Sequence, residues 1–223
     1  MLNYISFMKF ISILCVFATC TFWPCCLIYG FEFQFAPLGK SNKVEIGLET
    51  GFSGGMVRGT FPRVRGNINL QVEKPEEAKG LFQLDARSLH FGHYKVAGDA
   101  HSTEWLNSSA FPAISFTLHG FKKTRWNEKV LLATGYGDLQ VKKKKVNFSI
   151  PLSIRYLRGQ RRKIDGVHGD LLMLSGQSTV SRSQLGINPG FMMDTVLDKI
   201  TIKVNLVGGS DKVRPFLPSD LFR

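Results

Sequence analysis

Residues able to do chemistry gather in the middle of the chain, where His90, His93 and His101 share one short segment. Imidazoles at such spacing bind zinc when their rings converge on one point. Asp99 is the nearest acid, and no cysteine accompanies them. On a strand that runs into a loop the three rings have no shared face, so we predict no metal site. The structural alternative is that Asp99 fixes the tautomer of His101 by a hydrogen bond.

Hydrolytic chemistry is the second class that the side chains allow. The Gly-x-Ser-x-Gly motif, which places a nucleophilic serine on a tight turn, does not occur. The segment from Asp165 to Asp170 holds two acids and His168, but its glycines are typical of a turn. No dinucleotide-binding or phosphate-binding loop occurs either. We therefore predict that the protein is not an enzyme and carries no cofactor.

An uncharged run opens the chain. No charged residue occurs from Phe10 to Tyr29, and Lys9 comes directly before this run. A basic residue followed by an apolar core is typical of a secretory signal, whereas about 20 apolar residues can also span a bilayer. All four cysteines lie within the run, so the remainder has no disulfide. We expect residues 1–30 to be a cleaved signal peptide of a periplasmic or secreted protein, with an uncleaved membrane anchor as the alternative.

Alternation of apolar and polar residues dominates the remainder and indicates strands. The clearest strand is expected from Val146 to Tyr156, where every second residue is apolar. Pro62 and Pro151 predict a bend, a bulge or a sheet edge, because proline cannot donate to a ladder. Short helical pieces are expected at 74–80 and within 102–110. Further strands are expected at 31–35, 44–46, 56–61, 64–72, 81–87, 113–121, 130–139, 171–180 and 199–207.

Such a series of strands with one or two short helices predicts an all-β fold, either a sandwich or a barrel. One domain is expected over residues 31–208. Residues 209–223 contain two prolines and no periodicity, so we expect a flexible C-terminal tail there.

Four segments carry a resemblance that decides between these architectures. They are Val57-Arg58-Gly59-Thr60-Phe61 before Gly66-Asn67-Ile68, Asp99-Ala100-His101 before Trp105-Leu106 and Phe111-Pro112-Ala113-Ile114-Ser115-Phe116, Gly137-Asp138-Leu139 before Val146-Asn147-Phe148, and Ser181-Arg182-Ser183-Gln184-Leu185-Gly186-Ile187. In this order and with these gaps they resemble the YceI-like family of lipocalin-like, lipid-binding proteins over residues 31–207. Gln184, Leu185 and Lys142–Lys145 depart from the family pattern. The resemblance implies an exported, antiparallel, eight-stranded β-barrel with an isoprenoid or fatty chain in its centre.

The inward faces of the expected strands are consistent with such a ligand. A barrel of about eight strands either fills its interior with side chains or leaves room for one small ligand. No inward position carries a charge, so an open interior would select an apolar chain, and each buried methylene contributes about 0.8 kcal/mol. The residues predicted to line the apolar tunnel are Phe82, Leu84, Ile114, Phe116, Leu118, Val146, Phe148, Ile150, Leu152, Ile202 and Val204.

The expected mouth and surface give the remaining candidates. Asp99, His101 and Arg182 are predicted at the tunnel mouth, facing a lipid head group, with hydrogen bonds from Arg182 to the backbone as the alternative. The net charge of +12 suits an anionic membrane surface, met through Lys142–Lys145, better than nucleic acid in an exported protein. The lysines could equally be solvated strand ends. We expect lipid storage or transport. The alternative is a ligand-free barrel that acts through its basic surface, and the oligomeric state, a dimer included, is left open.

Overall fold

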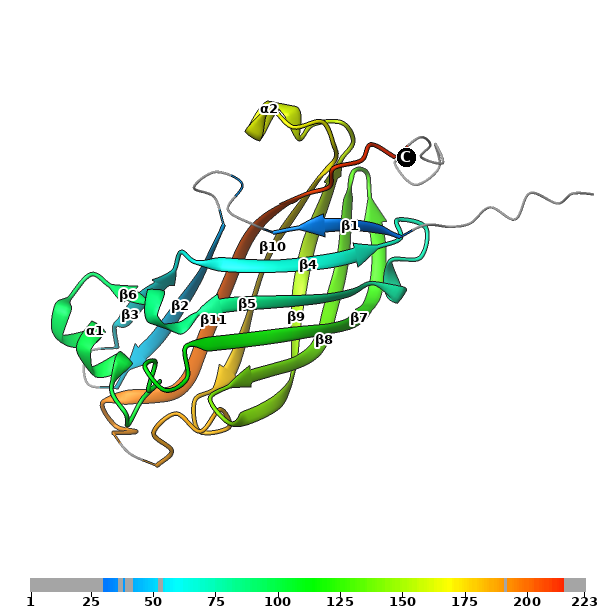
Figure 1. Cartoon of the computed structure of the whole chain (residues 1–223). Helices are drawn as coiled ribbons and strands as arrows, with labels where there is room; N and C mark the ends of the chain where they lie inside the picture. The colour runs from blue at the N-terminus through cyan, green and yellow to red at the C-terminus, as the bar shows by residue number, and fades with distance from the viewer. Residues whose placement is uncertain (1–29, 36–37, 39–41, 52–53, 191, 215–223) are drawn as a thin grey trace, which may run out of the picture.

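The computed structural model describes residues 30–35, 38, 42–51, 54–190 and 192–214. The expected signal peptide and the last residues of the expected tail lie outside this described part. Within it, one antiparallel sheet closes on itself (Figure 1). The closed ring runs in the order β1 (Phe31–Gln34), β4 (Val64–Leu70), β5 (Lys79–Asp85), β7 (Ala113–Asn127), β8 (Val130–Val141), β9 (Lys144–Leu157), β10 (Leu171–Ser181) and β11 (Val196–Gly209).

The ring closes through the N-terminal strand. Phe31–Gln34 pairs with β4 along its length, and Gln34 also pairs with Gly209 at the end of β11. Further along the same chain, β2 (Lys43–Thr50) pairs with the first part of β11 and with β3 (Met56–Phe61). The short β6 (His90–Phe91) extends β3. The predicted eight-stranded antiparallel barrel is therefore confirmed, with β2, β3 and β6 as an additional flap.

Pro62 and Pro151 each lie where the pairing of strands changes. β3 ends at Phe61 and β4 begins at Val64, so the predicted break at Pro62 is confirmed. Pro151 pairs with Thr134 on β8, but the ladder between β9 and β10 stops one residue earlier, at Leu152 and Gly176. Proline has no N–H to offer β10. β9 and β10 therefore separate beyond this point, and Ser178 Oγ bridges the seam by donating to Ser149 O at 2.7 Å.

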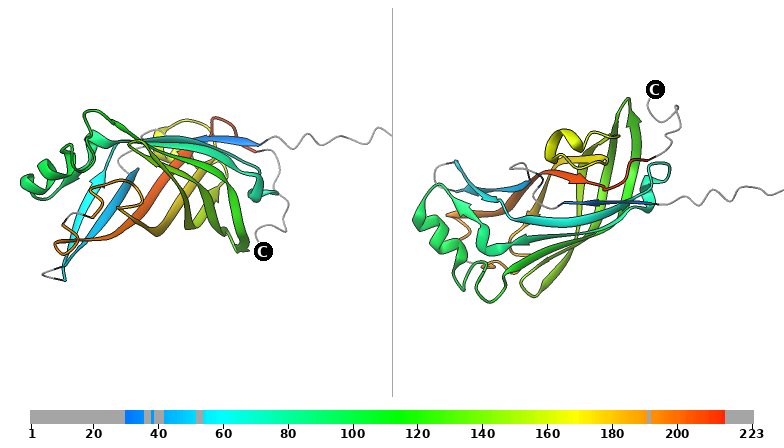
Figure 2. Two further views of the ribbon diagram at one scale, coloured as in Figure 1. Left: turned by 90° about the horizontal axis from the view of Figure 1, so that it is seen from below. Right: turned by 45° about the horizontal axis from the view of Figure 1, so that its top comes forward.

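Helical structure is short and lies outside the barrel wall. Pro75–Glu77 (η2) forms the predicted 3₁₀ turn, and Ala86–Ser88 (η3) forms another. The main helix, α1, spans Tyr94–His101, and α2 spans Arg162–Asp165. The helix predicted within 102–110 was wrong, because Ser102 ends α1 by donating its N–H to Asp99 O. Figure 2 shows α1 and α2 projecting from different ends of the barrel.

The end of the barrel that carries α2, called here the closed pole, is filled with side chains. Phe33, Ile68, Leu131, Ile154 and Leu172 are each at most 1% exposed. Residues 210–214 fold back over this end. Ser210 N–H donates to Asp170 O at 3.0 Å, and the N–H of Arg214 donates to Asp170 Oδ2 at 3.0 Å. Residues 210–214 of the expected tail are therefore hydrogen-bonded to the barrel, and the flexibility of the tail stays a prediction.

Candidate functional site

The other half of the barrel, towards α1, encloses an apolar cavity of about 170 Å³. Roughly 10–15 Å³ on the same measure holds one water molecule, so the space holds roughly a dozen groups of that size. Among the described lining residues, Ser115 is the one polar residue. The cavity is therefore apolar and presents no charged group to a bound molecule.

Strand alternation positions the lining. Along β9, Phe148, Ile150 and Leu152 point inward, and the residues between them are exposed or half-buried. Every second residue of β11 from Ile200 to Leu206 does the same. Several inward side chains are nonetheless only half-buried, namely Ile46, Leu48, Phe82, Leu84, Phe116, Ile202 and Val204. These side chains keep accessible surface because they border the cavity, which is partly open and reaches Ala100, Trp105 and Leu106 at the α1 end.

Most of the residues predicted to line a tunnel line this cavity. Leu118 and Val146 are the exceptions: Leu118 is buried and Val146 is half-buried, but neither borders the space. The predicted residues that do border it are Phe82, Leu84, Ile114, Phe116, Phe148, Ile150, Leu152, Ile202 and Val204. Their contact with a lipid stays a prediction, since the structure holds no ligand.

The mouth-end lining was missed from the sequence. Trp105 and Leu106 follow α1, while Leu185 and Ile187 lie in the loop between β10 and β11. Leu89, Phe91 and Ala100 complete this part of the lining. Phe91 belongs to β6 and Ala100 to α1, and the others lie outside helices and strands. No periodicity marks them, so the family resemblance was the signal in the sequence that pointed to these segments. They narrow the opening and surround whatever enters it.

His101 has a structural environment. Its Nε2 lies 2.8 Å from Leu89 O, and its Nδ1 lies 2.9 Å from Ser108 Oγ. A carbonyl only accepts, so Nε2 carries the proton and donates to Leu89 O, while Nδ1 accepts from the serine hydroxyl. Asp99 is exposed on α1. The tautomer of His101 is therefore fixed by Leu89 and Ser108, and not by Asp99 as the sequence suggested.

Arg182 is buried inside the mouth-end loop, with no exposed surface. Its guanidinium donates to Ile187 O and Asn188 O from one nitrogen, and to Val196 O at 3.1 Å from the other. It also lies 5.3 Å from the Trp105 ring centroid. Burial lowers the pKa of Arg182, although the carboxylate of Asp198 opposes this shift. These contacts match the expected alternative, in which Arg182 donates hydrogen bonds to the backbone. Arg182 therefore stabilises the loop that borders the mouth.

The histidines do not gather. His93 stacks on Tyr94, with ring centroids 5.0 Å apart, while His101 is turned to Leu89 and Ser108. In the described ranges, no group of three His, Cys, Asp or Glu side chains could hold a metal ion. The stacking of His93 and the hydrogen bonds of His101 are contacts that stabilise the local structure.

Comparison with known families adds to this geometry. A model of the YceI-like domain matches residues 40–208, which is most of the barrel. The chain belongs to the YceI-like family. Solved structures have the same fold: BcnA of Burkholderia cenocepacia shares 16% identity at a TM-score of 0.60, covering 74% of this chain and 95% of BcnA.

Two further structures are similar to this YceI-like protein. The YceI protein of Campylobacter jejuni shares 15% identity at a TM-score of 0.58, covering 69% of this chain and 85% of that one. A polyisoprenoid-binding domain of Saccharophagus degradans, implicated in plant cell wall breakdown, shares 9% identity at a TM-score of 0.59, covering 82% and 99%. A search of curated proteins found no match. No helix in the described part of the chain is long and apolar enough to cross a membrane.

Proposed function

We propose that this YceI-like protein is an exported lipid-binding protein that holds an apolar chain in the barrel interior, for storage or transport of the lipid. The observation that carries the proposal is the open cavity, whose described lining is apolar except for Ser115. The name of the similar Saccharophagus degradans domain supports a polyisoprenoid as the ligand class. A signal peptide at residues 1–30 and a periplasmic location belong to the same proposal.

The cavity limits how much chain is enclosed. Space for roughly a dozen water-sized groups corresponds to two or three isoprene units of five carbons each. At about 0.8 kcal/mol per buried methylene, this length gives a gross gain of roughly 10 kcal/mol, part of which association consumes. A longer isoprenoid leaves its remaining units, and its head group, at or beyond the mouth.

Two of the side chains predicted to contact a lipid head group already have partners within the protein. Arg182 and His101 are occupied by backbone and serine partners. Asp99 and Lys95, both on α1, are exposed. Recognition of the head group is therefore weak, and the apolar chain supplies most of the affinity.

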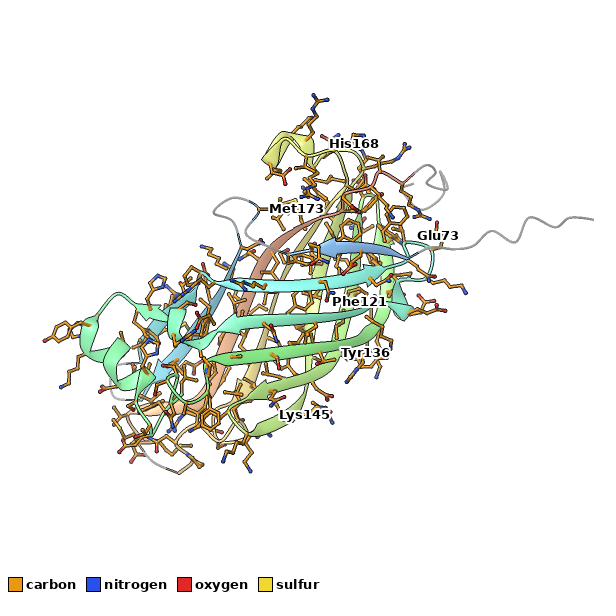
Figure 3. All side chains as sticks on the ribbon, in the orientation of Figure 1. Glu73, Phe121, Tyr136, Lys145, His168 and Met173 are labelled. Atoms are coloured by element: carbon orange, nitrogen blue, oxygen red, sulfur yellow. The ribbon has the colours of Figure 1, made fainter. Side chains whose placement is uncertain are left out.

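Contact with an anionic membrane through Lys142–Lys145 stays a prediction of the sequence. This turn joins β8 to β9 at the mouth end. Lys142 Nζ donates to Trp105 O at 2.9 Å, and Lys145 Nζ lies 2.8 Å from Asp138 Oδ2. Figure 3 shows Lys145 on the outside of the barrel. Lys143 and Lys144 are also exposed, and their ammonium groups form no ion pair within the described part of the chain.

The test is extraction of the purified protein with organic solvent, followed by mass spectrometry. We expect one apolar chain per barrel, and reloading of the emptied protein with isoprenoid alcohols of ten to fifteen carbons by the measure given above. An extract without any apolar molecule, together with failure to take up these alcohols or fatty acids of similar length, contradicts the proposal.

A further inference from the structure

The two ends of the barrel differ in charge as well as in packing. The closed pole comprises residues 122–130, 155–170 and 210–214, which contain eleven Lys and Arg and four Asp and Glu. The mouth end comprises residues 50–51, 54–56, 86–112, 141–144, 182–190 and 192–196, with six Lys and Arg and three Asp and Glu. One of these six, Arg182, is buried. The stronger positive surface therefore lies opposite the cavity mouth.

Two of the four acids of the closed pole, Asp165 and Asp170, have partners within this end of the barrel, whereas Glu128 and Asp211 are exposed. Asp170 is fully buried and accepts from Tyr156 Oη at 2.6 Å and from Gly159 N–H at 2.7 Å. Asp165 pairs with Arg161 at 3.0 Å. By contrast, the basic side chains are mainly exposed: Lys122, Lys123, Arg125, Lys129, Arg155, Arg158, Arg162, Lys163 and Lys212. The η2 turn borders this surface, and its acids are partly paired, Glu77 with Lys74 and nearby Glu73 with Arg214.

Exposed aliphatic side chains lie in the middle of this charge. Ile164 in α2 is 53% exposed and Val167 just after it is 43% exposed. Arg162, Lys163 and His168 flank them, and the loop projects beyond the barrel (Figure 3). Apolar side chains at a protruding tip, surrounded by Lys and Arg, suit the interface of an anionic bilayer. A nucleic acid would complement the positive charge, but its phosphates would make no favourable contact with the aliphatic side chains at the tip.

Both ends of the described part of the chain also lie at the closed pole. β1 begins at Phe31, which pairs with Leu70 at the closed end of β4. The uncharged run from Phe10 to Tyr29 is therefore joined to the barrel at the closed pole. Arg214, the last described residue, lies there too, with Arg158 Nε donating to its carbonyl at 2.6 Å. Both chain ends thus leave the barrel beside the basic surface.

We propose that the closed pole docks on an anionic lipid bilayer, with Ile164 and Val167 at the interface and the basic side chains on the lipid head groups. The cavity mouth and α1 then face away from the membrane. In this orientation the barrel exchanges its guest with the aqueous compartment or with a partner there, and not with the bilayer on which it stands. The docking does not depend on what the cavity holds.

The experiment is sedimentation of the full chain with vesicles, using phosphatidylcholine alone and phosphatidylcholine mixed with phosphatidylglycerol. A Lys or Arg near an anionic surface is worth about fivefold in affinity. We expect the triple variant K123Q/R162Q/K163Q to lose at least tenfold in partition to the anionic vesicles. The matched mouth variant K95Q/K143Q/K144Q, which removes as many exposed charges, should lose less than twofold. The variant I164S/V167S should weaken binding and leave its salt dependence unchanged.

Other outcomes overturn the proposal. A larger loss in the mouth variant means that the barrel docks mouth first, through the lysine cluster. Equal losses in both triple variants mean attraction by net charge without an orientation. No preference for anionic vesicles, or tighter binding of the protein to duplex DNA than to the vesicles, excludes the bilayer as the partner. Mass spectrometry of the same samples reports the cavity content separately, so a failed docking and an empty cavity are distinguishable.

Discussion

The rings of Phe35 and Phe82 meet inside the barrel, with centroids 5.2 Å apart and an interplanar angle of 59°. Phe82 lines the cavity, and Phe35, fully buried, lies beyond it towards the closed pole. On its other side the Phe35 ring rests on Gly208, where an added Cβ would lie 2.7 Å from the ring. Phe35 therefore lies between Phe82 and β11, directly behind the part of the cavity lining that Phe82 forms.

Removing the Phe35 ring from behind Phe82 should lengthen the cavity. We expect Phe35→Ala to take up a chain that is one or two isoprene units longer than the chain held by the native protein. The substitution should also cost about 3–5 kcal/mol of unfolding free energy, the range for a buried Phe→Ala. Competition between isoprenoid alcohols of increasing length, read by mass spectrometry, measures the change in preference.

Phe33→Ala is the matched control for this prediction. Phe33 is also 0% exposed, but its ring packs on Tyr156 in the closed pole, at 6.1 Å between centroids. Its removal should cost similar stability without changing the preferred chain length. The same length preference in both variants would mean that the Phe35 ring does not limit the length of the bound chain.

A charge on the cavity wall should abolish loading. Phe148 and Phe116 pack edge to face across the lining, 5.9 Å apart. In Phe148→Asp the carboxylate would have to lose water to admit an apolar chain, at a cost of several kcal/mol. We expect no lipid in the extract of this variant, and normal loading in Phe148→Leu. Thermal unfolding of both variants checks that the barrel still forms, and lipid in a folded Phe148→Asp protein would place the ligand elsewhere.

The barrel and most of its lining followed from period-two alternation, because a strand fixes the face on which each side chain lies. Val146 to Tyr156 is the clearest case: the predicted inward residues from Phe148 to Tyr156 are all buried. Pro151 was correctly expected to mark a change in pairing, since its missing N–H is a local property. These features depend only on neighbours in the sequence.

The packing of Phe35 and the course of the mouth-end loops could not be predicted in the same way. Phe35 continues the alternation of residues 31–35, and only the closed barrel brings its ring against both Phe82 and Gly208. Trp105, Leu185 and Arg182 lie in loops, whose path is set by tertiary hydrogen bonds and not by a period. The helix at 94–101 was missed for a related reason, since none of its residues is buried and no apolar stripe marks it.

Arg182 should contribute strongly to stability through the carbonyls that it satisfies. Arg182→Met leaves the oxygens of Ile187, Asn188 and Val196 without this donor, and each unsatisfied buried group costs about 1–3 kcal/mol. We expect a loss of about 3 kcal/mol or more in urea unfolding. Arg182→Lys should recover little, because one ammonium cannot reproduce the planar fork. The exposed Arg65 supplies the control, since Arg65→Met should change stability by less than about 0.5 kcal/mol.

The link between the mouth-end loop and β11 should weaken in acid. Partial burial alone would raise the pKa of Asp198, but hydrogen bonds from the N–H and hydroxyl of Ser183, at 2.9 and 2.8 Å, outweigh it and hold the pKa below its usual value. A carboxyl with a depressed folded pKa stabilises the fold above its unfolded value, about 3.9, and this contribution is lost as the pH falls through the folded pKa. Unfolding free energies measured from pH 6 to pH 2 should therefore fall less steeply in Asp198→Asn. An identical slope in both proteins would remove Asp198 from the acid response.

Trp105 should report on the guest directly, because its side chain lines the cavity while Trp126 lies in β7 near the closed pole. In the double variant Trp23→Phe/Trp126→Phe, we expect entry of an apolar chain to shift the remaining emission to shorter wavelength as water leaves the cavity. In Trp23→Phe/Trp105→Phe, the same titration should leave the emission of Trp126 unchanged. A shift that follows Trp126 and not Trp105 would mean that the chain binds outside the mouth half of the barrel. If the shift follows Trp105, its dependence on ligand concentration gives the affinity of the cavity without separating bound from free lipid.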